Sequence, residues 1–570
     1  MRLIVVILLF FSAISQGQKQ PNIIFILTDD QGYGDFSCFG NPYLDTPNMD
    51  KLKSESLFMS NFHVSAVCAP TRAAILTGRY NYRTGVTSVN QSRVNMHPEE
   101  HTIAEYLKDA GYNTGLFGKW HLGYNYPMRA NDQGFDEVVT WEEMQYGRFN
   151  PIMDVNGESQ HFYGHFLTDL IFDKAIDFVE RKSTANKPFF AFIPTFLPHT
   201  HPDGKQVPDK YVKPFEDEKD LIQHTKEVYG MVSKVDENIG RLMKRVTELG
   251  LDENTLIIFT SDNGPASHGP RRGGQKRYNN NYRGVKGEGY EGGIRVPLLM
   301  RWIGKYNNEQ EVDEFTAHID LLPTIMDICD VPLKRNKVLD GKSLLPLIEN
   351  KKVKWERTYY HHFLVPWSKE GNDAFQKTLW KKSVVYDGAY KLVEGKELFD
   401  LSNDPYEKVD LAKQKPEKVK QLQKDYLNWL DEVIDQDNLP SYPNHIGNDI
   451  QPITNLFYFE KVSNEEGWPV KVEESGNYKI TLEDIQHKVL PNHTKAIISV
   501  KGKEFYGYTN KKDKDLVIDN VKLPKGEYYL KVIFEGYKKQ KEAYDPVRMR
   551  YANITKGDYG HRMVRVQKQD

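Results

Sequence analysis

The chain has 570 residues, and its 76 lysines and arginines nearly balance 79 aspartates and glutamates, for a net charge of −3 at pH 7. Hydrophobic residues make up 39% of the sequence and charged residues 27%, which excludes a polytopic membrane protein, a collagen-like chain and a largely disordered one. A chain so close to neutral is not a globally basic nucleic-acid coat, and we expect no nucleic-acid partner.

The first 18 residues have the order of a secretory signal peptide. A short basic start, Met1-Arg2, precedes an apolar run over residues 3–11 and then small and polar residues. The run is well below the roughly 20 residues that span a bilayer. We therefore expect a periplasmic or secreted protein with no stable membrane anchor.

Three short apolar runs, at residues 21–27, 188–196 and 255–260, predict buried parallel strands. Between the last two, apolar residues recur at helical spacing over residues 228–249. This alternation of strand and helix is typical of an α/β fold. Ligands of such folds bind beyond the carboxyl ends of the strands, where Asp29-Asp30 and Asp262-Asn263 follow two of the runs.

The pattern changes beyond about residue 335. A helix is predicted over residues 416–434, and residues 440–452 are rich in Pro, Asn and Gly, as in a linker. Short alternating segments then predict an antiparallel β-sandwich, with strands at residues 478–482, 496–500, 516–521 and 528–534. After the signal peptide (1–18), the predicted parts are an α/β domain (19–335), a smaller subdomain (336–440) and the β-sandwich (453–570).

One segment carries a specific motif, Cys68-Ala69-Pro70-Thr71-Arg72, followed by Thr77-Gly78-Arg79. Further motifs follow in order: GKWHLG at 118–123, Pro198-His199-Thr200, and GVKG at 284–287 leading into EGGIRVP at 291–297. Together with the acidic pairs after the strands, this order resembles the type I, formylglycine-dependent sulfatases of the alkaline-phosphatase-like superfamily. The resemblance implies a mixed sheet sandwiched by helices and a smaller α+β C-terminal subdomain.

The resemblance also implies a cofactor and a modified residue. In this family a formylglycine-generating maturation enzyme oxidises the motif cysteine, here Cys68, to 3-oxoalanine. A single Ca²⁺ is implied as well, and oxygen ligands suit such a hard cation. Its implied ligands are Asp29, Asp30, Cys68, Asp262 and Asn263. The implied catalytic residues are Cys68, Arg72, Lys119, His121, His199 and Lys286.

Sulfate ester hydrolysis explains why these residue types are needed. Negative charge spreads over the sulfate oxygens and grows on the leaving oxygen, so cations stabilise the reaction. A hydrated aldehyde at position 68 offers one hydroxyl to form a covalent sulfo-enzyme intermediate and a second to expel sulfate. By resemblance, Arg72 and Lys119 steady the formylglycine and His121 assists the second step. His199 and Lys286 contact sulfate and donate the proton to the leaving alcohol.

The substrate prediction rests on a loop between two of the motifs. Its cations are Arg271, Arg272, Lys276, Arg277 and Arg283. Facing the pocket, they would suit a polyanionic sugar, whereas a solvated surface loop is the alternative. With the β-sandwich, this predicts a sulfated polysaccharide or oligosaccharide: an algal galactan, ulvan, fucan or glycosaminoglycan. The family often has Pro-His-x-Pro here, whereas this chain has Pro198-His199-Thr200-His201. His201 is therefore a second candidate for the proton donor to the leaving alcohol, or for a substrate contact.

Three other functions fit parts of the same pattern. The first is an arylsulfatase acting on small sulfate esters, and the second a phosphate or phosphonate monoester hydrolase of the same superfamily. The third is a glycan-binding protein with an inactive catalytic domain, which the presence of every motif residue argues against. The tyrosines and tryptophan of the β-sandwich, Trp468, Tyr506 and Tyr508, are expected to pack in its core, with a sugar platform as the alternative.

Overall fold

The structure is a computed structural model. It describes residues 20–569 apart from segments 90–92, 142–147, 186, 201–204, 267–276, 307, 334–336, 364–378, 435–441, 458–466, 484–492, 511 and 536–562. The predicted signal peptide therefore lies outside the described residues. Among the residues that are described, no helix has both the length and the apolar character needed to cross a membrane.

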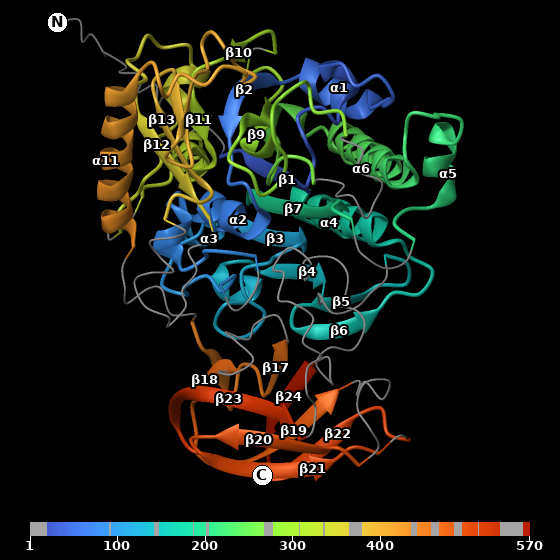
Figure 1. Ribbon diagram of the computed structural model, residues 1–570. Coiled ribbons are helices and arrows are strands. Elements are labelled where there is room, and N and C mark those ends of the chain that lie inside the picture. The colour runs from blue at the N-terminus through green and yellow to red at the C-terminus, as the bar shows by residue number, and fades with distance from the viewer. Residues whose placement is uncertain are drawn as a thin grey trace, which may run out of the picture.

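A large mixed sheet forms the centre of the molecule (Figure 1). Its middle strands β8, β1, β7, β3 and β4 run parallel, and β9 and β5 are antiparallel to their neighbours. In spatial order the strands are β10 (Glu311–Val312), β2 (Leu57–His63), β9 (Arg295–Arg301), β8 (Thr255–Ser261), β1 (Asn22–Asp29), β7 (Phe189–Pro198), β3 (Asn113–Gly118), β4 (Glu137–Trp141), β5 (Ile152–Val155) and β6 (Glu158–His161), with β11 (Thr316–Ala317) beside β2. The three predicted strands are confirmed as β1, β7 and β8.

Helices cover both faces of this sheet, so that two hydrophobic cores form. Alternate residues of β1 point to opposite faces: Phe25 packs in one core with α2, α3 and α8, and Ile26 in the other with α4 and α6. The predicted helix over 228–249 is confirmed as part of α6. The helices are α1 (Pro47–Ser54), α2 (Cys68–Thr77), α3 (Ile103–Asp109), α4 (Leu167–Ser183), α5 (Asp209–Val212), α6 (Gln223–Glu248), α7 (Glu291–Ile294), α8 (Leu321–Ile328) and α9 (Leu345–Ile348).

A second, four-stranded antiparallel sheet follows in the chain, and α11 (Pro416–Val433) covers its outer face (Figure 1). Its strands are β12 (Thr358–His362), β13 (Ser383–Asp387), β14 (Tyr390–Val393) and β15 (Glu397–Asp400). Val384 and Tyr386 on its inner face pack against α2 and the residues just before it. The first turn of α2 is thereby enclosed between the two sheets.

A buried ionic cluster fastens the smaller sheet to the larger one. Lys391 on β14 lies 2.8 Å from a carboxylate oxygen of Glu291 and 2.7 Å from one of Glu407, and all three side chains are fully buried. Tyr386 donates to Glu291 at 2.6 Å, and His63 on β2 lies 3.1 Å from it. Glu291 begins α7, so the cluster also fixes the segment that carries EGGIRVP.

We expect Lys391→Met to lower the free energy of unfolding by about 3–5 kcal/mol, because it leaves buried carboxylates without their cation. Thermal or urea unfolding measures the change. The matched control is Lys396→Met, since Lys396 is exposed and pairs with Glu394 at 3.1 Å; we expect a change below about 1 kcal/mol there. Equal losses for the two variants would contradict this role for the cluster.

The C-terminal part is a β-sandwich of two sheets, drawn in red and orange at the foot of Figure 1. One sheet has the order β16 (Asn444–Ile446), β18 (Trp468–Val472), β23 (Gly526–Phe534), β20 (Lys495–Val500) and β21 (Lys503–Tyr508). The other has the order β17 (Ile453–Phe457), β24 (Met563–Lys568), β19 (Gly476–Glu483) and β22 (Leu516–Leu523). The four strands predicted here are confirmed within β19, β20, β22 and β23.

Three details of the sandwich differ from the sequence prediction. The pairing is antiparallel except that β16 runs parallel to β18, and β16 itself lies inside the stretch predicted as a linker. Trp468 is fully buried in the core, as predicted. Tyr506 and Tyr508 are instead 59% and 54% exposed, because both point outward from the edge strand β21.

Candidate active site

The N-terminus of α2 carries the first two site residues. Cys68 is the first residue of this helix, and Arg72 follows one turn later, so both side chains lie on one face. The entire helix is buried, including Arg72, although arginine side chains are rarely fully buried. Arg72 is stabilised there by a 2.6 Å ion pair with Asp262 and a hydrogen bond to the Lys119 carbonyl oxygen at 2.9 Å.

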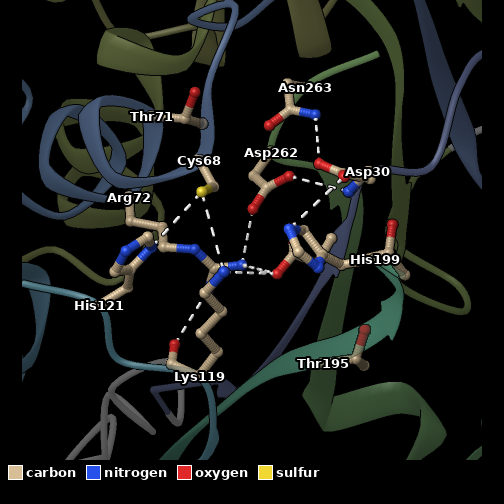
Figure 2. Close-up of polar contacts among 12 residues, drawn as sticks. Asp30, Cys68, Thr71, Arg72, Lys119, His121, Thr195, His199, Asp262 and Asn263 are labelled. Atoms are coloured by element: carbon tan, nitrogen blue, oxygen red, sulfur yellow. Dashed lines mark hydrogen bonds and ion pairs between the residues drawn. The ribbon is translucent and has the colours of Figure 1, made fainter. Parts of the chain in front are cut away.

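Lys119 and His121 reach Cys68 from the loop after β3 (Figure 2). His121 Nδ1 lies 3.4 Å from Cys68 Sγ, and Lys119 Nζ lies 3.8 Å from it. Gly118 and His121 both have positive φ, of 134° and 63°. A Cβ on Gly118 would lie 1.9 Å from the Pro194 carbonyl oxygen, so this turn requires glycine. The left-handed His121 is a sparsely populated conformation of the kind found at functional sites.

The acidic residues meet because β1 and β8 are adjacent parallel strands. Thr28 pairs with Ser261 in register, so the residues after each strand lie side by side. The Asp30 backbone N–H donates to Asp262 at 3.2 Å, and the Asn263 amide donates to Asp30 at 2.8 Å. Asp29 accepts from Lys119 at 2.8 Å. Asp30 and Asp262, 232 residues apart in the sequence, thus lie in one cluster.

The charges of this cluster are strongly perturbed. Burial alone would raise the pKa of Asp29, but nearby cations, Lys119 foremost, hold it well below its usual value. Burial and the negative charge of Asp29 raise the pKa of Asp262 well above its usual value, although Arg72 opposes this. One carboxylate is therefore compensated by cations, whereas its neighbour lacks sufficient positive charge.

The cluster fits a hard divalent cation. Ligand-type atoms of Asp29, Cys68 and Asp262 lie within 4.8 Å of one another, as do those of Asp29, Asp30 and His199. Asp29 Oδ1 and Asn263 Oδ1 are buried and have no hydrogen-bond partner among the described residues. Buried oxygens of this kind normally have a partner, and oxygen donors suit Ca²⁺ or Mg²⁺. A cation there would also supply the charge that Asp262 lacks.

His199 and Lys286 contact the same cluster from the other side (Figure 2 shows His199). Lys286 forms an ion pair with Asp30, and His199 Nε2 lies 3.8 Å from that carboxylate. Although the His199 side chain is 31% exposed, the surrounding protein desolvates it and lowers its pKa to about 3, with Asp30 opposing the shift and Lys286 adding to it. Burial therefore favours the neutral form of His199.

Two of the predicted substrate residues pair with carboxylates of the protein itself, and their contact with a substrate stays a prediction. Arg277 is buried and pairs with Asp35 at 2.8 Å while donating to the Asp30 carbonyl oxygen at 2.5 Å, so it supports the acidic turn from below. Arg283 stacks 3.8 Å from the Tyr290 ring and pairs with Glu397 of the smaller sheet at 3.2 Å. His201, Arg271, Arg272 and Lys276 lie outside the described residues.

The β-sandwich contacts the loop that carries Lys119 and His121. Asn125, fully buried, donates to Asn444 Oδ1 at 2.8 Å and to the Asn455 carbonyl oxygen at 2.7 Å. The Asn125 side-chain oxygen accepts from the Asn455 backbone N–H at 3.2 Å. The Asn125 amide therefore pairs with the backbone of β17 as a neighbouring strand would. The Asn125 carbonyl accepts from Met128, whose carbonyl accepts from the Trp120 indole at 2.9 Å. The sandwich is thereby linked to the residue between Lys119 and His121.

We expect Asn125→Ala to lower kcat about tenfold with a smaller change in KM, because the loop loses its anchor while the other residues of the site stay in place. It leaves several buried polar groups unpaired, so we also expect about 2–4 kcal/mol less stability. Steady-state kinetics on the folded fraction and thermal unfolding measure the two effects. Asn131→Ala, which removes only an exposed 3.4 Å contact to Asn156, is the control and leaves both unchanged. Unchanged kcat in Asn125→Ala would show that the loop needs no such support.

The fold and the site together define the class of protein: an α/β protein with a buried thiol at a helix N-terminus, cations around it and a carboxylate cluster suited to a divalent cation. Comparison with known proteins identifies the family to which this class of protein belongs. The family model "Sulfatase" matches residues 21–331, and the model "N-sulphoglucosamine sulphohydrolase, C-terminal" matches residues 286–436. The chain belongs to the sulfatase family.

Individual relatives share the catalytic part of the chain. The N-acetylgalactosamine-6-sulfatase of Canis lupus familiaris is 30% identical over 358 residues, which cover 58% of this chain and 66% of that protein. Human arylsulfatase A is 33% identical over 368 residues, covering 58% and 68%. The chain thus spans about two thirds of the length of these relatives. The crystal structure of Ps i-CgsB in complex with k-i-k-neocarrahexaose is 25% identical, with a TM-score of 0.64, and covers 75% of this chain and 95% of its own.

Proposed function

We propose that the protein is a sulfatase, a sulfuric ester hydrolase that cleaves sulfate monoesters on a sulfated glycan through a formylglycine formed from Cys68. The observation that carries the proposal is the placement of Cys68 Sγ within 3.4 Å of His121 and 3.8 Å of Lys119, beside the acidic cluster. Membership of the sulfatase family supports the same reaction. The net reaction consumes one water and yields an alcohol and inorganic sulfate.

Cys68 Sγ stands where the oxygens of the formylglycine would lie. An aldehyde hydrate there would supply one hydroxyl to take up the sulfuryl group and a second to release it as sulfate. His121 Nδ1 is in reach of that position and can hold the proton of the second hydroxyl. Lys119, which also pairs with Asp29, contributes positive charge toward the sulfate oxygens.

The acidic cluster is proposed to hold one Ca²⁺, with Asp29, Asp30, Asp262, Asn263 and position 68 as ligands. The bound ion would add positive charge against the sulfate oxygens. Arg72 orients Asp262 toward this site through their 2.6 Å contact. Lys286, beside Asp30, is placed to protonate the leaving alcohol, and neutral His199 can donate a hydrogen bond to a sulfate oxygen.

The substrate class is proposed from the relatives. The dog relative is named for a sulfated amino sugar, and the Ps i-CgsB structure holds a carrageenan-type oligosaccharide. A sulfated polysaccharide or oligosaccharide fits both names. The apolar leader at residues 3–11 supports export to the periplasm or beyond, and conversion of Cys68 requires a formylglycine-generating enzyme as a partner.

The test is a substrate panel with protein co-expressed with a formylglycine-generating enzyme. The panel holds an aryl sulfate, the matching aryl phosphate, and oligosaccharides from carrageenan, ulvan, fucoidan, chondroitin sulfate and heparan sulfate. We expect sulfate release, measured by ion chromatography, from one glycan class in preference to the aryl ester. Faster turnover of the phosphate than of every sulfate would replace the proposal with a phosphate monoester hydrolase.

A further inference from the structure

One buried arginine near the site lacks a carboxylate partner among the described residues. Arg148 is 4% exposed, and its hydrogen bonds go only to neutral groups: the Gln206 amide oxygen at 3.4 Å and the carbonyl oxygen of His199. Its Nη1 atom is buried and has no hydrogen-bond partner in the described part of the chain. Burial of an unpaired cation is costly, so such a group normally has an anionic partner.

Other buried arginines of the molecule follow that rule. Arg72 and Arg301 lie 2.6 Å from a carboxylate, and Arg277 lies 2.8 Å from one. Arg148 differs from all three. Burial lowers its pKa to about 10, and the opposing interaction comes from Asp29, with which it forms no ion pair. The anion that would balance Arg148 is therefore not supplied by the described protein.

Arg148 lies beside the active site, because its guanidinium contacts the backbone of His199. It follows β4, whose carboxyl end lies at the same edge of the sheet as those of β1 and β8, because all three strands are parallel. The Arg148 backbone is fixed by the Leu167 N–H at 2.7 Å, at the start of α4. Its guanidinium contacts the backbone of His199, whose side chain faces Asp30. None of its hydrogen bonds involves Cys68, Lys119 or Lys286.

We propose that Arg148 forms a second anion-binding subsite, which receives an acidic group of the saccharide other than the sulfate that is cleaved. The inference rests on the proposed sulfatase function and makes the substrate at least dianionic. A guanidinium fork matches both a sulfate ester and a uronate carboxylate. The 3.4 Å contact with Gln206 is long, so an anion can replace it at little cost.

The kinetic test compares Arg148→Gln and Arg148→Lys with wild type on four substrates. These are an aryl sulfate, a monosulfated neutral disaccharide, a disulfated disaccharide without uronate and a monosulfated disaccharide with uronate. We expect Arg148→Gln to lower kcat/KM about 100-fold, mainly through KM, on the dianionic substrate whose second anion binds at Arg148. On the two monoanionic substrates we expect a loss of only about threefold. Arg148→Lys should recover part of the loss, because it retains the charge but not the fork.

The two dianionic arms identify whether the second anion is a sulfate or a carboxylate. The control Arg181→Gln, on α4, removes an exposed ion pair with Glu137 of β4 and should leave all four rates unchanged. An equal loss on all four substrates would overturn the inference, because it would place Arg148 at the cleaved sulfate or in the fold alone. No loss on any substrate would overturn it as well.

A binding measurement separates this inference from the proposed function. Calorimetry with Cys68→Ala protein and the intact disulfated disaccharide reports binding without turnover. We expect the double variant with Arg148→Gln to bind about 100-fold more weakly than Cys68→Ala alone, and to bind the monosulfated disaccharide equally well or within threefold. If wild type cleaves no sulfate at all but this difference holds, the subsite stands and the sulfatase proposal fails.

Discussion

Cys68→Ala is expected to lower turnover of every sulfate ester by about 10⁴-fold or more, because it removes the residue proposed to supply the nucleophile that attacks the sulfur of the sulfate ester. The variant should fold normally, since alanine is smaller and the Sγ contacts at 3.4 and 3.8 Å are the polar interactions it loses. The measurement is sulfate release under substrate saturation, with mass spectrometry of the peptide containing position 68 in both proteins. Wild type should show the mass of 3-oxoalanine.

Two further variants sharpen this prediction. Cys38→Ala removes an exposed thiol that lies outside the sulfatase motifs and should retain full turnover. Wild type expressed without the maturation enzyme retains the thiol and should be as inactive as Cys68→Ala. Full activity of unmodified Cys68 protein would show that the thiol itself is the nucleophile, and the formylglycine mechanism would have to be abandoned.

Removal of divalent cations is expected to have the second largest effect. We expect chelation to lower turnover by about 10³-fold, because the site then lacks the positive charge of the proposed cation, which would stabilise the negative charge on the sulfate oxygens. Adding Ca²⁺ back at about 1,000 times its Kd should stabilise wild type by about 4 kcal/mol. Thermal unfolding with and without Ca²⁺ measures this stabilisation independently of activity.

The variant that tests the ligand set is Asp29→Asn, since the buried Asp29 Oδ1 has no hydrogen-bond partner among the described residues. We expect most of the Ca²⁺-dependent rise in melting temperature to disappear. Asp209→Asn, at an exposed position that pairs only with Lys205, should keep it. A wild-type melting temperature that does not respond to Ca²⁺, Mg²⁺ or Mn²⁺ would contradict a metal site at this cluster.

The strands and helices that build the centre of the molecule were predictable because each buries a large apolar surface. Continuous apolar runs at β1, β7 and β8 and the helical spacing in α6 leave few other ways to remove these side chains from water. The β-sandwich was predictable for the same reason, through alternation. The short β16 was missed, because three residues in a Pro- and Asn-rich stretch carry no periodic signal.

The residues around Cys68 were predicted from the resemblance of their motifs to the sulfatase family, and the structure shows the local geometry that brings them together. The four-residue spacing of Cys68 and Arg72 places them on one helical face, and Gly118 permits the turn that brings Lys119 and His121 to the thiol. The sequence did not show that Arg277 is buried. The charge of a loop residue does not reveal whether its side chain is exposed. Arg277 is buried because it forms an ion pair with the buried Asp35.

The sequence by itself thus determined the fold class, the family and the residues that gather at Cys68. Only the tertiary structure decided which charges are balanced. The motif marks Arg72 but does not reveal its partner Asp262, 190 residues away, and no pattern in the sequence shows that the hydrogen bonds of Arg148 go only to neutral oxygens of the described residues. Asn125 likewise gains its role only when β17 folds back beside it. Pairing across such separations depends on strand order and burial, and local residue patterns contain neither.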